Sequence, residues 1–225
     1  MSAEKTHDMM DEKETGRIEA FSDGVFAIAI TLLVLDMKVP HANVLPVNGG
    51  LLSVLLQQWP AYLSYFISFV TILIIWVSHH RLFTYIKRSN DMFLFLNGLL
   101  LMFVALVPFP TALLSQYVNT EYSPVVTAIY SGTYMAIAAI FNIIWLYASN
   151  NKRLLSKRAD PCVVQNITKQ YLFGPPLYLL AFLLSFISPP LSVAACFILA
   201  VFFALTGAIN RLLPCDLCQI EPPSK

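Results

Sequence analysis

Residues 17–36 read RIEAFSDGVFAIAITLLVLD, a stretch long and apolar enough to cross a membrane as a helix but with a carboxylate inside it. A helix needs about 20 apolar residues to span a bilayer core about 30 Å thick. An ionisable side chain that faces lipid is costly, so such a group is expected to face protein. We therefore expect Asp23 and its neighbour Ser22 to lie against another helix of a membrane protein.

The composition of the whole chain is that of an integral membrane protein. Of its 225 residues, 57% are hydrophobic and 12% are charged, and the mean hydropathy is +0.67. A soluble domain carries about 25% charged residues. The formal net charge of +1 gives no reason to expect a nucleic-acid partner. The first residues are polar and mostly acidic, unlike a signal peptide, so the first apolar segment is expected to remain as an anchor in the bilayer.

Six segments qualify as membrane-spanning helices. They cover residues 18–38, 60–80, 92–115, 125–148, 171–188 and 191–210. The prediction is an all-α membrane domain over residues 18–210, flanked by tails of residues 1–17 and 211–225. The acidic N-terminal tail is expected to be disordered, although a gating role is open. The apolar stretch 51–59 is too short to span and either extends the second helix or lies at the membrane surface.

The positive charges indicate the orientation of the chain. If the N-terminus is cytoplasmic, thirteen of the fourteen Lys and Arg residues fall on the cytoplasmic side, and only Lys38 falls outside. Cytoplasmic loops of membrane proteins carry an excess of Lys and Arg. We therefore expect both tails to be cytoplasmic.

Helical periodicity separates an apolar stripe from the polar pair of the first helix. Each residue advances about 100° around a helix. The stripe lies within about 60° of Ile28 and contains Phe21, Ile28, Thr31, Leu32 and Leu35. Asp23 lies about 140° from Ile28, and Ser22 lies about 120° away on the other flank. The stripe and the polar pair are therefore expected on different faces.

The expected partners of Asp23 lie in WVSHHRLF, residues 76–83 of the second span. Trp76 precedes His79 by three residues and His80 by four, and both spacings share a helix face. Antiparallel first and second spans bring this cluster to the depth of Asp23, and Arg17 can join from the membrane surface. The cluster is either a polar clamp that fixes helix packing, a proton relay or gate that uses histidine charge, or an ion-binding site.

Other polar residues of the membrane domain and tail also allow more than one interpretation. Asn97 in the third span is expected to make an interhelical hydrogen bond. Asp36 either contributes to an acidic ring around an axis of four copies or is a solvated helix end beside Lys38. Cys215 and Cys218 form a lone C-x-x-C, which is a weak indication of a metal site, so no metal or other cofactor is expected.

The pattern R-x-x-x-F-S-D, formed by Arg17, Phe21, Ser22 and Asp23 and followed by GVFAIAITLLVL, resembles the first helix of the transmembrane protein 175 family. This family comprises lysosomal potassium channels and shorter prokaryotic relatives. Trp76, His79 and the stretch NGLLLMFVALVPFPTALL from Asn97 are similar to its second and third helices. The chain length resembles the six-span, single-repeat prokaryotic form, which implies a prokaryotic plasma membrane.

The resemblance implies a homotetramer whose four first helices line a central pore. It implies an apolar constriction at Ile28, with Thr31 or Leu32 and then Leu35 as the next layers outward, and a packing network of the F-S-D residues with the second helix. An apolar ring offers no oxygen ligands to an ion, so weakly hydrated ions pass best. The expected permeant ions are K⁺ and Cs⁺, with weaker Na⁺, and Thr31 is a candidate ligand for a partly dehydrated ion.

Other functional classes remain open at this point. A secondary transporter commonly has internal repeats and broken helices, and no repeat is visible in this sequence. A proton-conducting protein would use the Asp23 and His79 cluster, and an oligomeric scaffold would pass no ion. An enzyme is not expected, because no nucleophile stands beside that cluster and no Walker, H-E-x-x-H or G-x-S-x-G motif is present.

Overall fold

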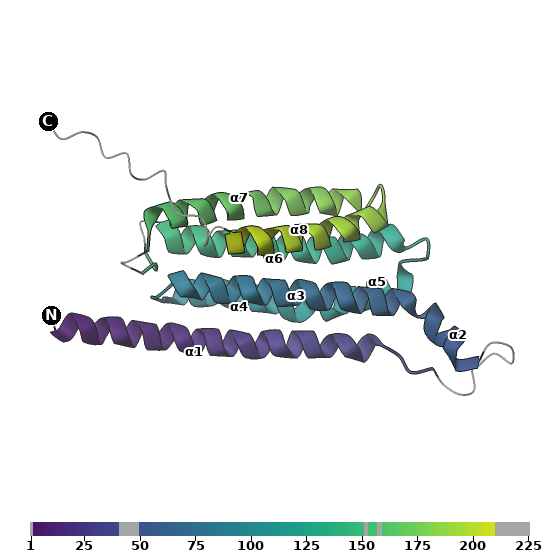
Figure 1. The fold of residues 1–225 in the computed structure, drawn as a ribbon, viewed down its shortest axis with the longest axis horizontal. Coiled ribbons are helices and arrows are strands. Elements are labelled where there is room, and N and C mark those ends of the chain that lie inside the picture. Colours follow the sequence, from purple (N-terminus) through teal and green to yellow (C-terminus); the bar gives the residue numbers. More distant parts are fainter. Residues whose placement is uncertain (1, 41–49, 151–152, 157–158, 210–225) are drawn as a thin grey trace.

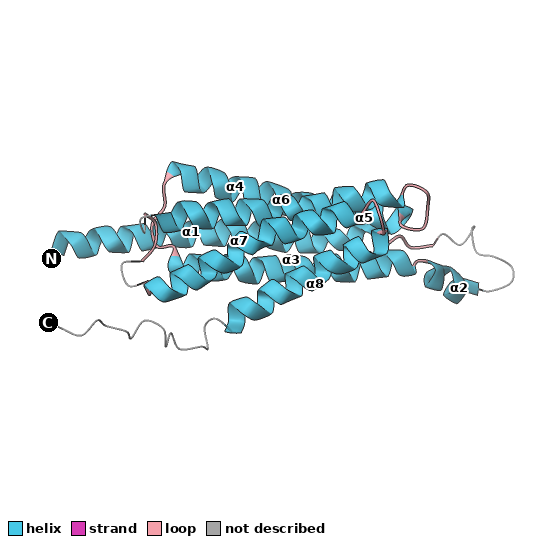
Figure 2. Cartoon of the chain, turned by 90° about the horizontal axis from the view of Figure 1, so that it is seen from above, coloured by secondary structure: helices cyan, strands magenta, loops and turns pink. Residues whose placement is uncertain are grey.

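The chain forms a bundle of long helices that run along one axis (Figures 1 and 2). The computed structural model describes residues 2–40, 50–150, 153–156 and 159–209, and these residues contain helices and no strand. The helices are α1 (Ser2–Leu32), α2 (Gly50–Gln57), α3 (Trp59–Tyr85), α4 (Asp91–Leu106), α5 (Pro108–Tyr117), α6 (Ser123–Ser149), α7 (Pro161–Leu184) and α8 (Pro189–Ile209), with a 3₁₀ turn η1 (Leu33–Asp36) after α1. The predicted all-α class is confirmed.

Polar caps and prolines set several helix boundaries. The Asn90 side chain accepts a hydrogen bond from the Phe93 N–H at 3.0 Å at the start of α4, and the Asp160 side chain accepts one from the Cys162 N–H at 2.9 Å at the start of α7. Such caps satisfy backbone donors that have no partner within the helix. The expected third span is divided into α4 and α5 beside Pro108, which lacks a backbone N–H to continue the helix.

Five helical segments of the described chain are long and apolar enough to cross a membrane. They are Glu14–Asp36, Trp59–Tyr85, Asp91–Tyr117, Ser123–Ser149 and Pro189–Thr206. The remaining expected span, residues 171–188, corresponds to α7, which starts ten residues earlier and ends at Leu184. Lys169 and Gln170 make α7 less apolar than the other five segments, yet α7 runs beside α6 along the bundle (Figure 1). We therefore describe α7, together with the five candidate spans, as the sixth long helical segment of the bundle in the described chain.

Three segments lie outside the expected spans. The disorder expected for the N-terminal tail is wrong for residues 2–17, because α1 begins at Ser2 and continues without a break into the first span. The expected tail over 211–225, with Cys215 and Cys218, lies outside the described residues. Residues 51–57 of the stretch 51–59 belong to the short α2, which Gln58 separates from α3, and Trp59 is the first residue of α3.

The arrangement of the helices leaves α1 at one side of the bundle. Figure 1 shows α3 and α4 next to α1, then α6 and α8, and α7 on the opposite side. The core between these layers contains large buried side chains, including Ile72, Leu100, Tyr130 and Trp145. Because α1 packs on α3 and α4 from one side only, its other side is left for lipid or another subunit.

Candidate functional site

A buried chain of hydrogen bonds joins α1 to α4 and α3. The Asn97 amide donates to Ser22 Oγ at 3.0 Å, and Ser22 Oγ donates to the Ile18 carbonyl at 2.8 Å. Asn97 Oδ1 lies 2.9 Å from His79 Nε2. Because an amide oxygen only accepts, His79 donates through Nε2. Ser22, His79 and Asn97 are all buried. Asn97 therefore makes the expected interhelical hydrogen bond, and it does so to both neighbouring helices, through Ser22 of α1 and His79 of α3.

The ring of His79 is enclosed by aromatic side chains. Its centroid lies 5.3 Å from that of Phe26 in α1, 4.8 Å from that of Phe83 and 6.4 Å from that of Phe141. Its Nδ1 atom is buried and has no hydrogen-bond partner among the described residues. His79 therefore points into the bundle.

The carboxylate of Asp23 is paired with an indole. Trp76 Nε1 donates to Asp23 Oδ1 at 2.7 Å. The other histidine, His80, lies 2.7 Å from the Glu19 carboxylate through Nδ1, and its ring stacks on Trp76 with centroids 6.2 Å apart. The expected cluster thus exists at one depth, as antiparallel spans require. Of the three expected partners in the second span, Trp76 is the one that bonds to Asp23, whereas His79 pairs with Asn97 and His80 with Glu19.

Arg17 and Phe21 do not belong to this buried network in the described part of the chain. Both lie on the exposed side of α1, whereas the side of α1 that packs on the bundle carries Ser22, Phe26, Ala29 and Leu33. These four residues recur at the spacing of a helix face. The motif residues therefore divide into two that face the bundle, Ser22 and Asp23, and two that face away from it.

The apolar stripe of α1 lies on its exposed side. Ile28 is 60% exposed and Leu35 is 73% exposed, and Leu32 and Thr31 are exposed between them. The Thr31 hydroxyl donates to the carbonyls of Ala27 and Ile28, at 3.0 and 2.9 Å. Its proton is thereby used within the helix, so its free lone pairs can face a cation. The structure thus places the stripe on one surface with a single hydroxyl among apolar side chains.

Asp36 is held at the end of this stripe by a neighbouring helix. The Ser115 hydroxyl of α5 donates to Asp36 Oδ2. The carboxylate is half-buried and lines a hollow together with Lys38 and Gln116. The sequence patterns do not identify Ser115 or Glu19 as site residues. A serine near the outer end of the third expected span is a weak signal, whereas Glu19, one helical turn before Asp23, could have been paired with His80 by the same reasoning of matching depth.

The comparisons with known proteins extend over most of the chain. The family described as "Endosomal/lysosomal potassium channel TMEM175" matches residues 17–108. A protein of Chamaesiphon minutus named as a potassium channel is 54% identical over 87% of this chain and 96% of its own length. The chain belongs to the TMEM175 family. This assignment confirms the expected family, makes the chain an integral membrane protein, and places it in a family of channels rather than enzymes.

A solved structure and a vertebrate protein complete the comparison with the TMEM175 family. The crystal structure of a lysosomal potassium-selective channel TMEM175 homolog from Chamaesiphon minutus matches with a TM-score of 0.79 and 52% identity, over 87% of this chain and 99% of that chain. The Gallus gallus protein named "Endosomal/lysosomal proton channel TMEM175" is 37% identical over 61% of this chain but only 28% of its own length. The chain therefore matches nearly the whole Chamaesiphon minutus chain, whereas only 61% of it matches a part of the Gallus gallus protein.

Within the described residues, no group of three or more His, Cys, Asp or Glu side chains could hold a metal ion. The polar side chains at the site instead form hydrogen bonds with one another, except that His79 Nδ1 has no partner among the described residues. Their geometry suits a rigid attachment of α1 to the bundle and leaves the stripe accessible.

Proposed function

We propose that the chain forms a potassium-permeable cation channel in which the first helices of four subunits surround a central pore. The arrangement of α1 carries this proposal. One face of α1 is joined to α4 by a buried hydrogen bond and to α3 by a partly buried one, and the stripe around Ile28 is exposed along the side of the bundle. The relatives named as potassium channels support the choice of ion.

In the proposed tetramer, four Ile28 side chains form the constriction, with Thr31 or Leu32 and then Leu35 farther outward. An ion that passes such a ring loses water and gains no carbonyl ligand, so K⁺ passes better than the more strongly hydrated Na⁺, and the discrimination is modest. A narrow apolar ring also empties of water easily, so a small movement of α1 is enough to block conduction. Both tails are proposed to lie in the cytoplasm, since this places nearly all Lys and Arg residues there.

Ion flux from proteoliposomes tests the proposal. Liposomes loaded with K⁺ are diluted into Na⁺ or a large organic cation, and K⁺ release is followed with an ion-selective electrode. A channel gives a flux that rises with the K⁺ gradient without saturating at low concentration, whereas a transporter saturates. The subunit number is measured on the same sample by native mass spectrometry, and four is expected. A folded oligomer that releases no K⁺ would overturn the proposal in favour of a scaffold.

A proton-conducting function is the second candidate. It is supported by the name of the Gallus gallus relative and by the buried, unpartnered Nδ1 of His79 near Asp23 in the described bundle. The same liposomes, loaded with a pH-sensitive dye and placed in a proton gradient, report this flux. Acidification that His79→Gln abolishes while K⁺ release persists would assign a proton path separate from the pore.

A further inference from the structure

Arg81 of α3 is a partly buried cation, and its hydrogen bond is to α8 and not to α1. It lies on α3 four residues before the helix ends at Tyr85, and it is half-buried. Its Nη1 donates to the Ala204 carbonyl of α8 at 3.0 Å, which uses one of the five N–H donors of a guanidinium. No carboxylate in the described part of the chain forms an ion pair with Arg81. A partly buried cation without a counter-charge is costly, so its surroundings favour an anion.

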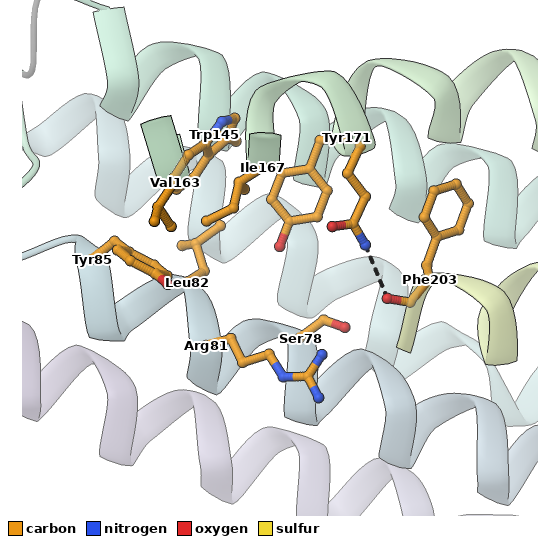
Figure 3. A pocket seen from close by; sticks show the side chains of 10 residues that line it. Ser78, Arg81, Leu82, Tyr85, Trp145, Val163, Ile167, Tyr171 and Phe203 are labelled. Atoms are coloured by element: carbon orange, nitrogen blue, oxygen red, sulfur yellow. Dashed lines mark hydrogen bonds between the residues drawn. The ribbon is translucent and has the colours of Figure 1, made fainter. Parts of the chain in front are cut away.

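Arg81 lines a hollow between α3, α6, α7 and α8. Figure 3 shows Arg81 and Ser78 of α3 facing Tyr171 of α7 across this hollow. A second hollow lies next to it and shares Ser78, Tyr171 and Phe203 with the first. The second hollow is lined mainly by apolar and aromatic side chains, and Arg81 is the only charged residue on the walls of either.

The two hollows follow one another along the bundle axis. Arg81 lies about 6 Å from the end of α3, and Ile74, which lines the second hollow, lies about 10 Å farther into the bundle at 1.5 Å per residue. A positive group near the end of a membrane helix, followed by an apolar hollow toward its middle, matches the order of headgroup and acyl chain in one leaflet. Basic pockets between membrane helices are suited to lipid headgroups.

We propose that these hollows bind an anionic phospholipid, with its phosphate on Arg81 and a segment of one acyl chain in the apolar hollow beyond Ser78. The remaining guanidinium donors form charge-assisted hydrogen bonds to phosphate oxygens. A net negative headgroup is preferred over a zwitterionic one, because no carboxylate neutralises Arg81. The second acyl chain stays in the bilayer. The bound lipid joins α3 to the α6–α8 half of the bundle and does not depend on which ion the protein conducts.

Native mass spectrometry of the full-length protein, with added phosphatidylglycerol or phosphatidylcholine of the same chains, tests this site. We expect one saturable phosphatidylglycerol per subunit and about tenfold weaker retention in Arg81→Gln, the size of effect that a charge-assisted hydrogen bond supports. Lys169→Gln removes an exposed charge of α7 that lines neither hollow, and it is expected to retain the lipid. Arg81→Lys is expected to retain part of the affinity.

A second variant tests the acyl-chain part without changing charge. Ser78→Leu places a larger side chain at the junction of the hollows and is expected to weaken phosphatidylglycerol retention, and it decides the matter if Arg81→Gln does not assemble. Equal retention of both phospholipids, or unchanged retention in folded Arg81→Gln and Ser78→Leu, would overturn the proposal. Tighter binding of a free fatty acid such as stearate than of phosphatidylglycerol would also overturn it, because the occupant would then not be a phospholipid.

Discussion

At the scale of single residues, Asp23 is tolerated in a membrane helix because it does not face lipid. Its carboxylate accepts the indole N–H of Trp76 at 2.7 Å, and its neighbour Ser22 accepts from Asn97. An intramembrane carboxylate with such partners need not be part of the ion path. We propose that it fixes the rotation of α1 about its own axis, which decides which side chains of α1 are exposed.

The Asp23–Trp76 pair is expected to stabilise the subunit without setting ion preference. Asp23→Leu and Trp76→Phe, alone and together, form a double-mutant cycle in which we expect a coupling of about 1 kcal/mol, near the upper part of the range for hydrogen bonds between membrane helices. The measurement is unfolding in mixed micelles followed by circular dichroism. Additive effects of the two changes would show that the pair contributes nothing as a pair.

Asn97 is expected to contribute more to the stability of the subunit than another buried asparagine. Asn97→Leu removes hydrogen bonds to both Ser22 and His79, so we expect a loss of about 1 kcal/mol of stability. Asn142 in α6 is the matched control, because it is also buried and its Nδ2 has no partner among the described residues. In thermal unfolding, Asn97→Leu should therefore have a lower melting temperature than Asn142→Leu. The reverse order would contradict the network described above.

Thr31 is the one hydroxyl on the exposed stripe that is proposed to meet the ion. Its proton is used by helix carbonyls, so the oxygen can coordinate a cation. Thr31→Ala is expected to lower the K⁺ over Na⁺ permeability ratio severalfold, by removal of one oxygen ligand per subunit, and Thr31→Ser should preserve it. Bi-ionic potentials measure both. An unchanged ratio in Thr31→Ala would remove Thr31 from the selectivity mechanism.

At the scale of the helix, α1 has two faces with different tasks. One face packs on α3 and α4 through Phe26, Ala29 and Leu33, and the other carries the stripe. In a single subunit, side chains that face lipid and side chains that face a pore are both exposed. In the assembled protein, only the side chains that face the pore are accessible to water. This distinction can be measured directly.

Cysteine modification provides that measurement. Leu35→Cys on the stripe is expected to react with a charged, membrane-impermeant thiol reagent and to lose most of its current, because the added group occupies the pore. Ile198→Cys in α8 is the control, since Ile198 is as exposed as the stripe but lies on a different helix. Wild-type protein corrects for the native cysteines. Protection of Leu35→Cys from the reagent would indicate that the stripe faces lipid.

At the scale of the whole molecule, the sequence predicts the features that depend on amino-acid composition and on the helical period. The helical class, the depth match between Asp23 and the second span, and the separation of the Ile28 stripe from the polar pair all follow from apolar length and a 100° period. The individual pairs do not follow from these, because Trp76, His79 and His80 lie within about one turn of α3 and a small rotation of α3 decides which one meets Asp23. The extent of α7 was also missed, since its first ten residues are too polar to be recognised as part of a membrane helix.

Ile28 is proposed to face the ion in a pore formed by several subunits. The most direct test is the reversal potential in a planar bilayer with K⁺ on one side and Na⁺ on the other, for wild type, Ile28→Asn and Ile198→Asn. The two isoleucines are 60% and 64% exposed, and both lie in membrane-spanning helices. We expect a K⁺-favouring potential in wild type and Ile198→Asn, and a larger current with a potential near zero in Ile28→Asn. Wild-type potential and current in folded Ile28→Asn would contradict the assignment of the constriction.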